Sequence, residues 1–555
     1  MNVAAVMMQI LRAAGVRYLF GNPGTTELTF LDALPDSGLE YIVGLQEATV
    51  ISAADGYAQA SGRAAIANVH VAPGVANGLS ALHNAARAKS PVVMTAGQQD
   101  SRFLMDDPIL SGDLVRMTEQ FTKWSYEVRR AHEAPVALRR ALAVAESPPT
   151  GPVFLSLPMN LMTDAVDDSG EAPGEVVTAT AAEPAALRRA AEILRDARSP
   201  LIIAGDGVAR ERAVAELVAV AELTGARVHG EPIYRRQSFP GDHPLWRGGL
   251  YPSPAAVRKA VDDSDAVLIV GANVFTWFLY APGEPFPRGV PVIQIDSDAR
   301  EIGRSYPVTL GLVADVKATL ATLRDAIAAH TTDTLGRAAR DRRERLARQR
   351  AEHVTRARAA ADAERERDPI SVSYLMSTLG TVLPGDAIVV DESASSLGAV
   401  LRYLPFTTTD SFFGSKTGTL GWAMGAAVGV QLARPDRKVV ATIGDGSVMY
   451  SPQALWTAAR YRLPITYIVP NNASYAILKA GMLGLGLPSA KQGKYPGMDL
   501  VDPEIDHVAL ARALGVRAER VTKPAALRDV LAVALAHDGP ALVDVVIDRG
   551  FKALG

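Results

Sequence analysis

Short apolar runs rich in β-branched residues alternate with helix-like stretches along most of the chain, and glycine or polar residues follow the runs. The clearest example lies between residues 438 and 472. Residues 438–443 predict a buried strand that ends at Gly444, residues 451–460 predict a helix, and residues 465–469 predict a second strand. Such a strand–helix–strand unit predicts a parallel sheet whose carboxyl strand ends share one rim, where open α/β sheets bind ligands.

The two predicted strand ends carry residues that suit a divalent cation. Asp445, within Gly444-Asp445-Gly446-Ser447, and Asn472, within Asn471-Asn472, should emerge side by side at this rim. Their anionic and neutral oxygens, with a backbone carbonyl nearby, suit Mg²⁺ or Ca²⁺ carrying a diphosphate. The glycines let the backbone approach phosphate oxygens, and the amides around Ser447 can donate to them. For the Gly-Asp-Gly motif alone, a tight turn without a ligand is the alternative interpretation.

The same alternation recurs along the rest of the chain. In the amino-terminal part it predicts strands at 18–20, 41–45, 65–71 and 91–96, with helices at 3–14 and 48–62. In the central part it predicts a helix at 186–197 and strands at 200–204, 267–270 and 292–295. We interpret Gly205-Asp206-Gly207 in that part as a turn, because no Asn-Asn pair accompanies it. Further strands are predicted at 387–390 and 541–547.

We therefore predict an α/β fold with three doubly wound parallel-sheet domains. Their predicted ranges are 1–168, 182–330 and 369–555, with a polar linker around 166–182 and a charged helical linker at 331–368. The mixed signs in the charged linker favour a solvated helix over a nucleic-acid-binding segment.

Composition narrows the function classes further. The chain has 555 residues, 48% of them hydrophobic, and a formal net charge of −3, so broad attraction to nucleic acid or an anionic membrane is not expected. It contains no cysteine, which excludes disulfides, thiolate metal sites and cysteine nucleophiles. With neither a signal-peptide pattern at the start nor a long apolar stretch, we expect a soluble cytoplasmic protein.

Gly444-Asp445-Gly446-Ser447 followed by Asn471-Asn472 resembles the metal–diphosphate motif of thiamine diphosphate (ThDP) enzymes. That family also has a glutamate in its amino-terminal domain, and Glu47 matches it within Leu45-Gln46-Glu47-Ala48. Taken alone, Glu47 could be only a first-turn charge favoured by the helix dipole. The resemblance covers essentially the whole chain, in the order pyrimidine-binding, central and diphosphate-binding domain. Within the family the chain is most similar to benzoylformate decarboxylases, through residues 20–24, 45–47, 95–99, 123–127 and 429–433.

The resemblance implies ThDP and Mg²⁺ (or Ca²⁺) as cofactors, whereas FAD has no clear signature. It implies that Asp445, Asn472 and the Ser474 carbonyl hold the metal. It also implies that Glu47 bonds the aminopyrimidine ring, with the Gly418 carbonyl facing that ring and Leu420 beneath the cofactor. The cofactor-binding set predicted in this way is Glu47, Pro23, Gly24, Ser395, Gly418, Leu420, Gly444, Asp445, Gly446, Ser447, Asn472, Ser474, Tyr475 and Ala476.

For the substrate, the resemblance implies a 2-oxo acid, with His70 as the residue that transfers protons and with Thr25 and Gln98 orienting the substrate. Taken alone, His70 could be a satisfied histidine at a strand end. The predicted pocket consists of Thr25, His70, Phe278, Ile477 and Leu478. Phe278 departs from the family pattern, because benzoylformate decarboxylases have a second active-site histidine there.

The implied reaction is decarboxylation of the 2-oxo acid through a C2 carbanion and an enamine. The alternative is a carboligase like acetolactate synthase, in which an aldehyde or a second 2-oxo acid is the acceptor. Loss of a proton donor at Phe278 favours this alternative slightly. A non-catalytic ThDP-fold binding protein is a third possibility, against which Glu47 and the metal motif argue. Family enzymes share sites between subunits, so we expect a homotetramer built as a dimer of dimers.

Overall fold

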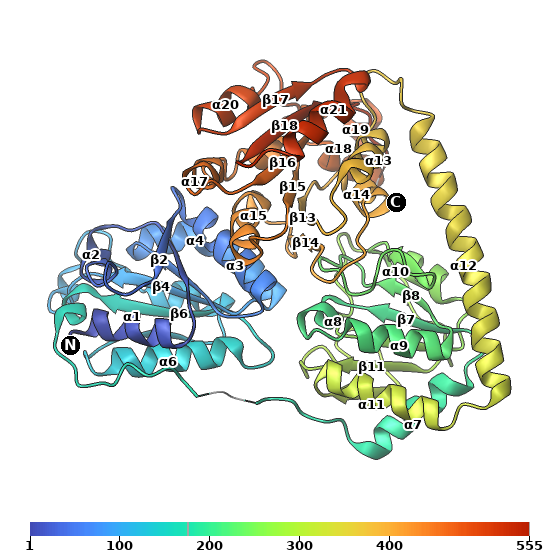
Figure 1. Ribbon diagram of the computed structural model, residues 1–555, viewed down its shortest axis with the longest axis horizontal. Helices are drawn as coiled ribbons and strands as arrows, with labels where there is room; N and C mark the ends of the chain where they lie inside the picture. Colours follow the sequence, from blue (N-terminus) through green and yellow to red (C-terminus); the bar gives the residue numbers. More distant parts are fainter. Residues whose placement is uncertain (175–176, 554–555) are drawn as a thin grey trace. The chain divides into compact units, whose positions relative to one another are not determined.

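The computed structural model describes residues 1–174 and 177–553, and the chain divides into two compact units (Figure 1). The first unit comprises Met1–Val176, Arg365–Leu397 and Ser415–Gly555; the second comprises Val177–Glu364 and Gly398–Gly414. The linker predicted around 166–182 includes residues 175 and 176, which lie outside the described residues. The predicted domain ranges therefore stay predictions.

The amino-terminal part of the first unit is a parallel sheet with helices on both faces. Its strands lie in the order β2 (Glu40–Val43), β1 (Tyr18–Gly21), β3 (Ala65–Val69), β4 (Val92–Gln98), β6 (Val153–Pro158) and β5 (Ser125–Glu127). Helices α1 (Val3–Ala13), α2 (Leu28–Leu31) and α6 (Glu133–Glu146) bury their apolar residues in one core against this sheet. Helices α3 (Glu47–Ser61) and α4 (Val71–Ala88) lie on the other face (Figure 1). The doubly wound arrangement predicted from the alternating pattern is confirmed.

The carboxyl-terminal part of the first unit has the same architecture. Parallel strands follow the order β13 (Ile388–Glu392), β15 (Val439–Ile443), β16 (Ile465–Asn471), β18 (Ala541–Val546) and β17 (Arg517–Val521). β15 and β16 are parallel neighbours in this sheet, so their carboxyl ends meet at the same rim. The helix expected over 451–460 begins three residues later, as α17 (Ala454–Arg460).

Close packing of α3 on α15 (Trp422–Ala433) joins the two parts of the first unit. A Cβ on Gly429 would lie 1.8 Å from the Ala53 carbonyl oxygen, and one on Gly425 would lie 2.6 Å from the Thr49 carbonyl oxygen. Glycine is therefore required where the helix backbones approach this closely. Trp422 Nε1 also donates to the buried Asp55 carboxylate at 2.8 Å.

The second unit contains a third parallel sheet. Its strands lie in the order β12 (Leu310–Val313), β11 (Val292–Asp296), β10 (Ala266–Val270), β7 (Pro200–Ala204), β8 (Arg227–Gly230) and β9 (Trp246–Gly249). Helices α7 (Pro184–Asp196), α9 (Val214–Thr224), α10 (Pro254–Val261) and α11 (Val316–Ala329) accompany it. The prediction of α/β architecture is confirmed for this part too.

The interpretation of Gly205-Asp206-Gly207 as a turn is wrong. Asp206 begins the short helix α8 (Asp206–Arg210), directly after β7. The Asp206 amide donates to Glu231 Oε1 at 3.0 Å, and the Asn273 amide donates to Glu231 Oε2 at 2.8 Å. The buried Glu231 carboxylate thus occupies amides at the ends of β7 and β10 that an anionic ligand could otherwise use.

The charged segment forms one long helix, α12 (Asp333–Asp362), but it is not solvated on all sides. Arg342 donates to the Thr224 carbonyl at 2.5 Å, and Arg350 donates to the Trp246 carbonyl at 3.1 Å. In the opposite direction, Arg247 of β9 donates to the carbonyl of Leu346, which lies on α12, at 2.7 Å. These contacts dock one side of α12 on the second unit. Among the described residues, no helix is long and apolar enough to cross a membrane.

Candidate active site

The predicted metal ligands lie together at the rim formed by β15 and β16. Asp445 is buried, only 5% exposed, and begins the short helix α16 (Asp445–Val448). Its Oδ1 accepts from the Gly446 amide at 2.8 Å, whereas its buried Oδ2 has no hydrogen-bond partner among the described residues. Burial raises the pKa of Asp445, and the amides of Gly446, Ala473 and Ser474 oppose that rise.

Asn472 and Ser474 form a tight turn beside Asp445, directly after β16. Asn472 Oδ1 accepts from the Ser474 amide at 3.0 Å, and the Ser474 hydroxyl donates to the Met498 carbonyl at 3.0 Å. Both residues are 5% exposed. The turn is therefore buried and fixed by its own hydrogen bonds.

These residues fit a hard cation. The unpartnered Asp445 oxygen is a buried acceptor that a cation would satisfy, and the neighbouring donor atoms are oxygens, as Mg²⁺ and Ca²⁺ prefer. Nowhere among the described residues do three acidic, histidine or cysteine side chains gather around a possible metal position. A cation here would therefore have one carboxylate ligand and would complete its coordination with phosphate oxygens, which is how Mg²⁺ commonly binds.

Glu392, which sequence reasoning missed, supports the loop that leads into α15. It lies at the end of β13 and accepts from the Gly421 amide at 2.6 Å and the Ala423 amide at 2.7 Å. Burial raises its pKa to about 8, against the opposing effect of these amides and the Ser447 hydroxyl. The only sequence signal was a carboxylate at a strand end.

The loop before α15 presents Gly418 and Leu420 at the surface of the unit. Gly418 is exposed with φ +74°, and Leu420 is 36% exposed. The preceding amides of Lys416 and Thr417 donate to Asn84 Oδ1, on α4, at 2.8 and 3.2 Å. The loop therefore rests on a helix of the amino-terminal part.

Glu47 contacts the same face of α4. It is 8% exposed at the start of α3, where it accepts from Asn22 Nδ2 at 3.1 Å and Asn77 Nδ2 at 3.0 Å. Asn77 and Asn84 are two turns apart on α4, about 10 Å along its axis. Within one chain, Glu47 and the loop that carries Gly418 therefore contact the same face of α4, two turns apart.

His70 stands in a cluster that sequence reasoning described only in part. Its Nδ1 lies 2.7 Å from Glu27 Oε2 and 3.1 Å from the Thr26 hydroxyl. Glu27 is 1% exposed, and its other oxygen accepts from the Gly97 amide at 2.7 Å. Because a carboxylate only accepts, Nδ1 carries the proton, and Nε2 is the ring nitrogen that can accept one.

The backbone around His70 is also unusual. Val71, which follows it, has φ +36°, a conformation that costs a β-branched residue energy and is found at functional sites. A Cβ on Gly24 would lie 2.3 Å from the His70 ring, so only glycine allows the ring to lie on this loop. The predicted substrate contact Thr25 is exposed, whereas its neighbour Thr26 is the residue that touches the imidazole.

The remaining predicted residues are divided between the two units. Gln98 is 1% exposed, and its Nε2 donates to the Gly112 carbonyl at 3.0 Å and to Glu127 at 3.2 Å, so it supports the 98–112 loop. Phe278 belongs to the second unit and is 63% exposed there. The others lie in the first unit, in the exposed loop segments or after β16: Pro23, Ser395, Tyr475, Ala476, Ile477 and Leu478.

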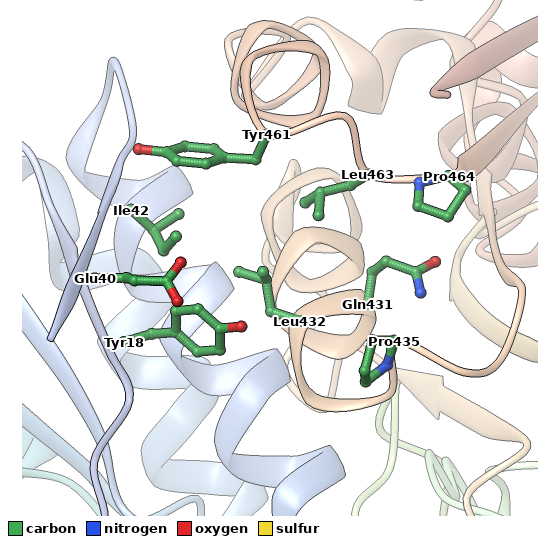
Figure 2. Close-up of a pocket in the computed structure, with 9 residues that line it drawn as sticks. All are labelled: Tyr18, Glu40, Ile42, Gln431, Leu432, Pro435, Tyr461, Leu463 and Pro464. Carbon is green, nitrogen blue, oxygen red and sulfur yellow. The ribbon is translucent and has the colours of Figure 1, made fainter. Parts of the chain in front are cut away.

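A cavity of about 270 Å³ elsewhere in the first unit is not this site (Figure 2). The Tyr461 hydroxyl at its edge donates to the Tyr41 carbonyl and accepts from the Val43 amide, both at 2.9 Å, and so covers the outer edge of β2. Its lining offers one carboxylate, no histidine and no hydroxyl nucleophile other than tyrosine: Tyr18, Glu40, Ile42, Gln431, Leu432, Pro435, Tyr461, Leu463 and Pro464.

Three family models match the chain in the order of its three sheets. They are the amino-terminal thiamine pyrophosphate (TPP, another name for ThDP) binding domain over residues 1–116, the central domain over 187–323, and the carboxyl-terminal TPP binding domain over 394–545. The chain belongs to the thiamine pyrophosphate enzyme family.

Relatives within this family differ in their reactions. The chain is 35% identical to a benzoylformate decarboxylase of Pseudomonas aeruginosa over 98% of both chains. It is 28% identical to the acetolactate synthase isozyme 2 large subunit of Escherichia coli over 99% of this chain and 96% of that one. Among solved structures, the ThDP-dependent 4-hydroxybenzoylformate decarboxylase of Rhodococcus jostii matches with a TM-score of 0.86 and 32% identity, covering 99% of this chain and all of that one.

Proposed function

We propose that this protein is a ThDP- and Mg²⁺-dependent enzyme that decarboxylates a 2-oxo acid without oxidation, in the manner of benzoylformate decarboxylase. The observation that carries the proposal is the 35% identity to such a decarboxylase over 98% of both chains. The His70 cluster supports it, because it offers a positioned proton-transfer group at the rim of the amino-terminal sheet.

The residues divide into those that would hold the cofactor and those that would move protons. When bound, ThDP supplies a carbon nucleophile and an electron sink. Asp445, Asn472 and the Ser474 carbonyl would hold the cation and its diphosphate, and Glu47 would bond the pyrimidine ring. Glu27 holds the His70 imidazole through Nδ1, so that Nε2 can give or take a proton at the substrate.

Carboligation by an acetolactate synthase-like reaction is the second candidate. Phe278 favours it, because a phenyl ring cannot transfer a proton and slower protonation leaves time for an acceptor carbonyl. The full-length similarity to the Escherichia coli acetolactate synthase subunit also supports it. The placement of Phe278 beside the site is part of this proposal.

Product analysis by mass spectrometry tests both candidates. Purified protein with ThDP and Mg²⁺ is incubated with benzoylformate, pyruvate and branched 2-oxo acids, each with and without an aldehyde acceptor. Free aldehyde with CO₂ would support the decarboxylase, whereas a 2-hydroxyketone or an acetohydroxy acid as main product would support the carboligase. Bound ThDP without turnover of any of these substrates would point instead to a different 2-oxo acid or to a non-catalytic binding role.

The variant Glu47→Gln separates chemistry from folding. It should abolish turnover while leaving circular dichroism and thermal unfolding close to wild type, because Gln cannot take up a proton in place of the carboxylate. Unchanged turnover would contradict the role of Glu47.

We also propose that the enzyme is a homotetramer with sites shared between subunits. Apolar side chains in the segments around the rim of the carboxyl-terminal sheet are 36–54% exposed in the first unit: Leu420, Met449, Tyr450 and Leu478. A second subunit would remove them from water. Sedimentation of the active enzyme as a monomer would contradict this assembly.

A further inference from the structure

A buried histidine contacts the backbone of the loop that carries Asp445, one of the proposed metal ligands. His507 begins α20 (His507–Ala513), is 1% exposed, and places Nε2 3.0 Å from the carbonyl oxygen of Asp445. Because a carbonyl only accepts, His507 Nε2 is the donor of this hydrogen bond. The bond therefore fixes the peptide between Asp445 and Gly446, whose amide in turn donates to Asp445 Oδ1 at 2.8 Å.

A buried aspartate lies beside the same histidine and accepts a hydrogen bond from the second half of the site. Asp544 is fully buried on β18, and its Oδ2 lies 4.0 Å from His507 Nδ1, a close approach of two buried atoms but not a hydrogen bond. Its Oδ1 accepts from Asn471 Nδ2 at 2.9 Å. Asn471 precedes the proposed metal ligand Asn472, and its own Oδ1 accepts from the Ala473 amide at 3.0 Å.

The pair thus reaches both segments that would hold the cation. His507 bonds the Asp445 peptide, and Asp544 bonds the side chain of Asn471. The Asn471 side chain in turn bonds the backbone of the turn after β16. Arg520 Nε stands 3.6 Å from Asp544 Oδ2, which helps to balance the buried charge. A histidine that only filled space would not need a donor aimed at the Asp445 carbonyl.

We propose that His507 and Asp544 are positioning residues that hold the Asp445 loop and the Asn471–Asn472 turn at the separation required by a divalent cation. The inference rests on the proposed Mg²⁺–ThDP site. Neither residue would touch the cation, so the effect would be on the geometry of its ligands, as with outer-shell partners in other metal sites.

The test measures Mg²⁺ affinity rather than activity. Mg²⁺ is titrated into apoenzyme at saturating ThDP, and cofactor uptake is followed by calorimetry, for the wild type, His507→Phe and His507→Gln. Phe keeps a ring of similar volume but has no donor, whereas Gln keeps an N–H that can reach the Asp445 carbonyl. We expect His507→Phe to weaken Mg²⁺ binding roughly 10- to 100-fold, and His507→Gln to restore most of the affinity.

Two controls separate the possible failures. His537→Phe, at a partly buried histidine of the same domain, should leave Mg²⁺ affinity unchanged. If His507→Phe does not fold, Asp544→Leu replaces it, because Leu has a similar volume but no oxygen that can accept from Asn471 Nδ2; it should also weaken Mg²⁺ binding. Wild-type affinity in the folded variants would overturn the positioning role alone. Failure of the wild type to take up ThDP with Mg²⁺ would overturn the cofactor site together with it.

Discussion

Replacing Glu27 by glutamine should lower the activity of His70 without removing any residue that reaches the substrate. Four donors meet the two oxygens of this buried carboxylate. Oε2 accepts from His70 Nδ1 at 2.7 Å and the Gly24 amide at 2.8 Å. Oε1 accepts from the Gly97 amide at 2.7 Å and the Thr26 hydroxyl at 2.9 Å. A glutamine NH₂ in place of either oxygen faces donors and cannot accept their hydrogen bonds.

The magnitude follows from the bond to His70. A hydrogen bond to a charged group contributes about 1.5–3 kcal/mol, and 1.36 kcal/mol corresponds to tenfold in rate. If the Glu27–His70 bond is needed to hold the imidazole in the transition state, Glu27→Gln should reduce kcat/KM roughly 10- to 150-fold.

The assay is steady-state consumption of the 2-oxo acid identified by product analysis, measured for Glu27→Gln, His70→Ala and the double variant. If Glu27 acts through His70, the double variant should be no slower than His70→Ala, as the double-mutant cycle requires for coupled residues. Glu40→Gln is the matched control, because Glu40 is an exposed glutamate of the same domain that pairs with Arg17 at 3.3 Å. Wild-type kcat/KM in Glu27→Gln, or losses that simply add in the double variant, would refute the reasoning.

Two further predictions concern stability. Gly429→Ala should lower the free energy of urea unfolding by about 1–3 kcal/mol, because its Cβ would meet the Ala53 carbonyl at 1.8 Å; Gly385→Ala, with open space around its Cβ, should not. Glu392 has a folded-state pKa of about 8 against an unfolded value of 4.5, so its proton stabilises the folded state at low pH and that stabilisation is lost as pH rises toward 8. In apoenzyme, the free energy of unfolding of the wild type relative to Glu392→Gln should therefore fall by up to about 4 kcal/mol from pH 5 to pH 8. Parallel pH profiles of the two melting temperatures would contradict this.

The sequence by itself determined the architecture and predicted which residues form the candidate site. Short apolar β-branched runs that end in glycine or polar residues are typical of the buried strands of parallel sheets. This pattern can be read from residues that are close together in the sequence. Asp445 and Asn472 could be placed together because each directly follows a predicted strand of the same unit. Parallel strands bring their carboxyl ends to one edge whatever the rest of the fold does.

Only the tertiary structure decided which partners each functional group has. Glu27 meets His70 from 43 positions away, and His507 meets Asp445 from 62 positions away. Neither pairing leaves a periodic signal, because a hydrogen bond between distant segments depends on how whole helices and strands pack. The same reason explains why Gly205-Asp206-Gly207 was misinterpreted: the Glu231 carboxylate that bonds the Asp206 amide comes from the end of another strand. Local pattern fixes which elements form, whereas the chemistry of a buried polar group depends on its long-range neighbours.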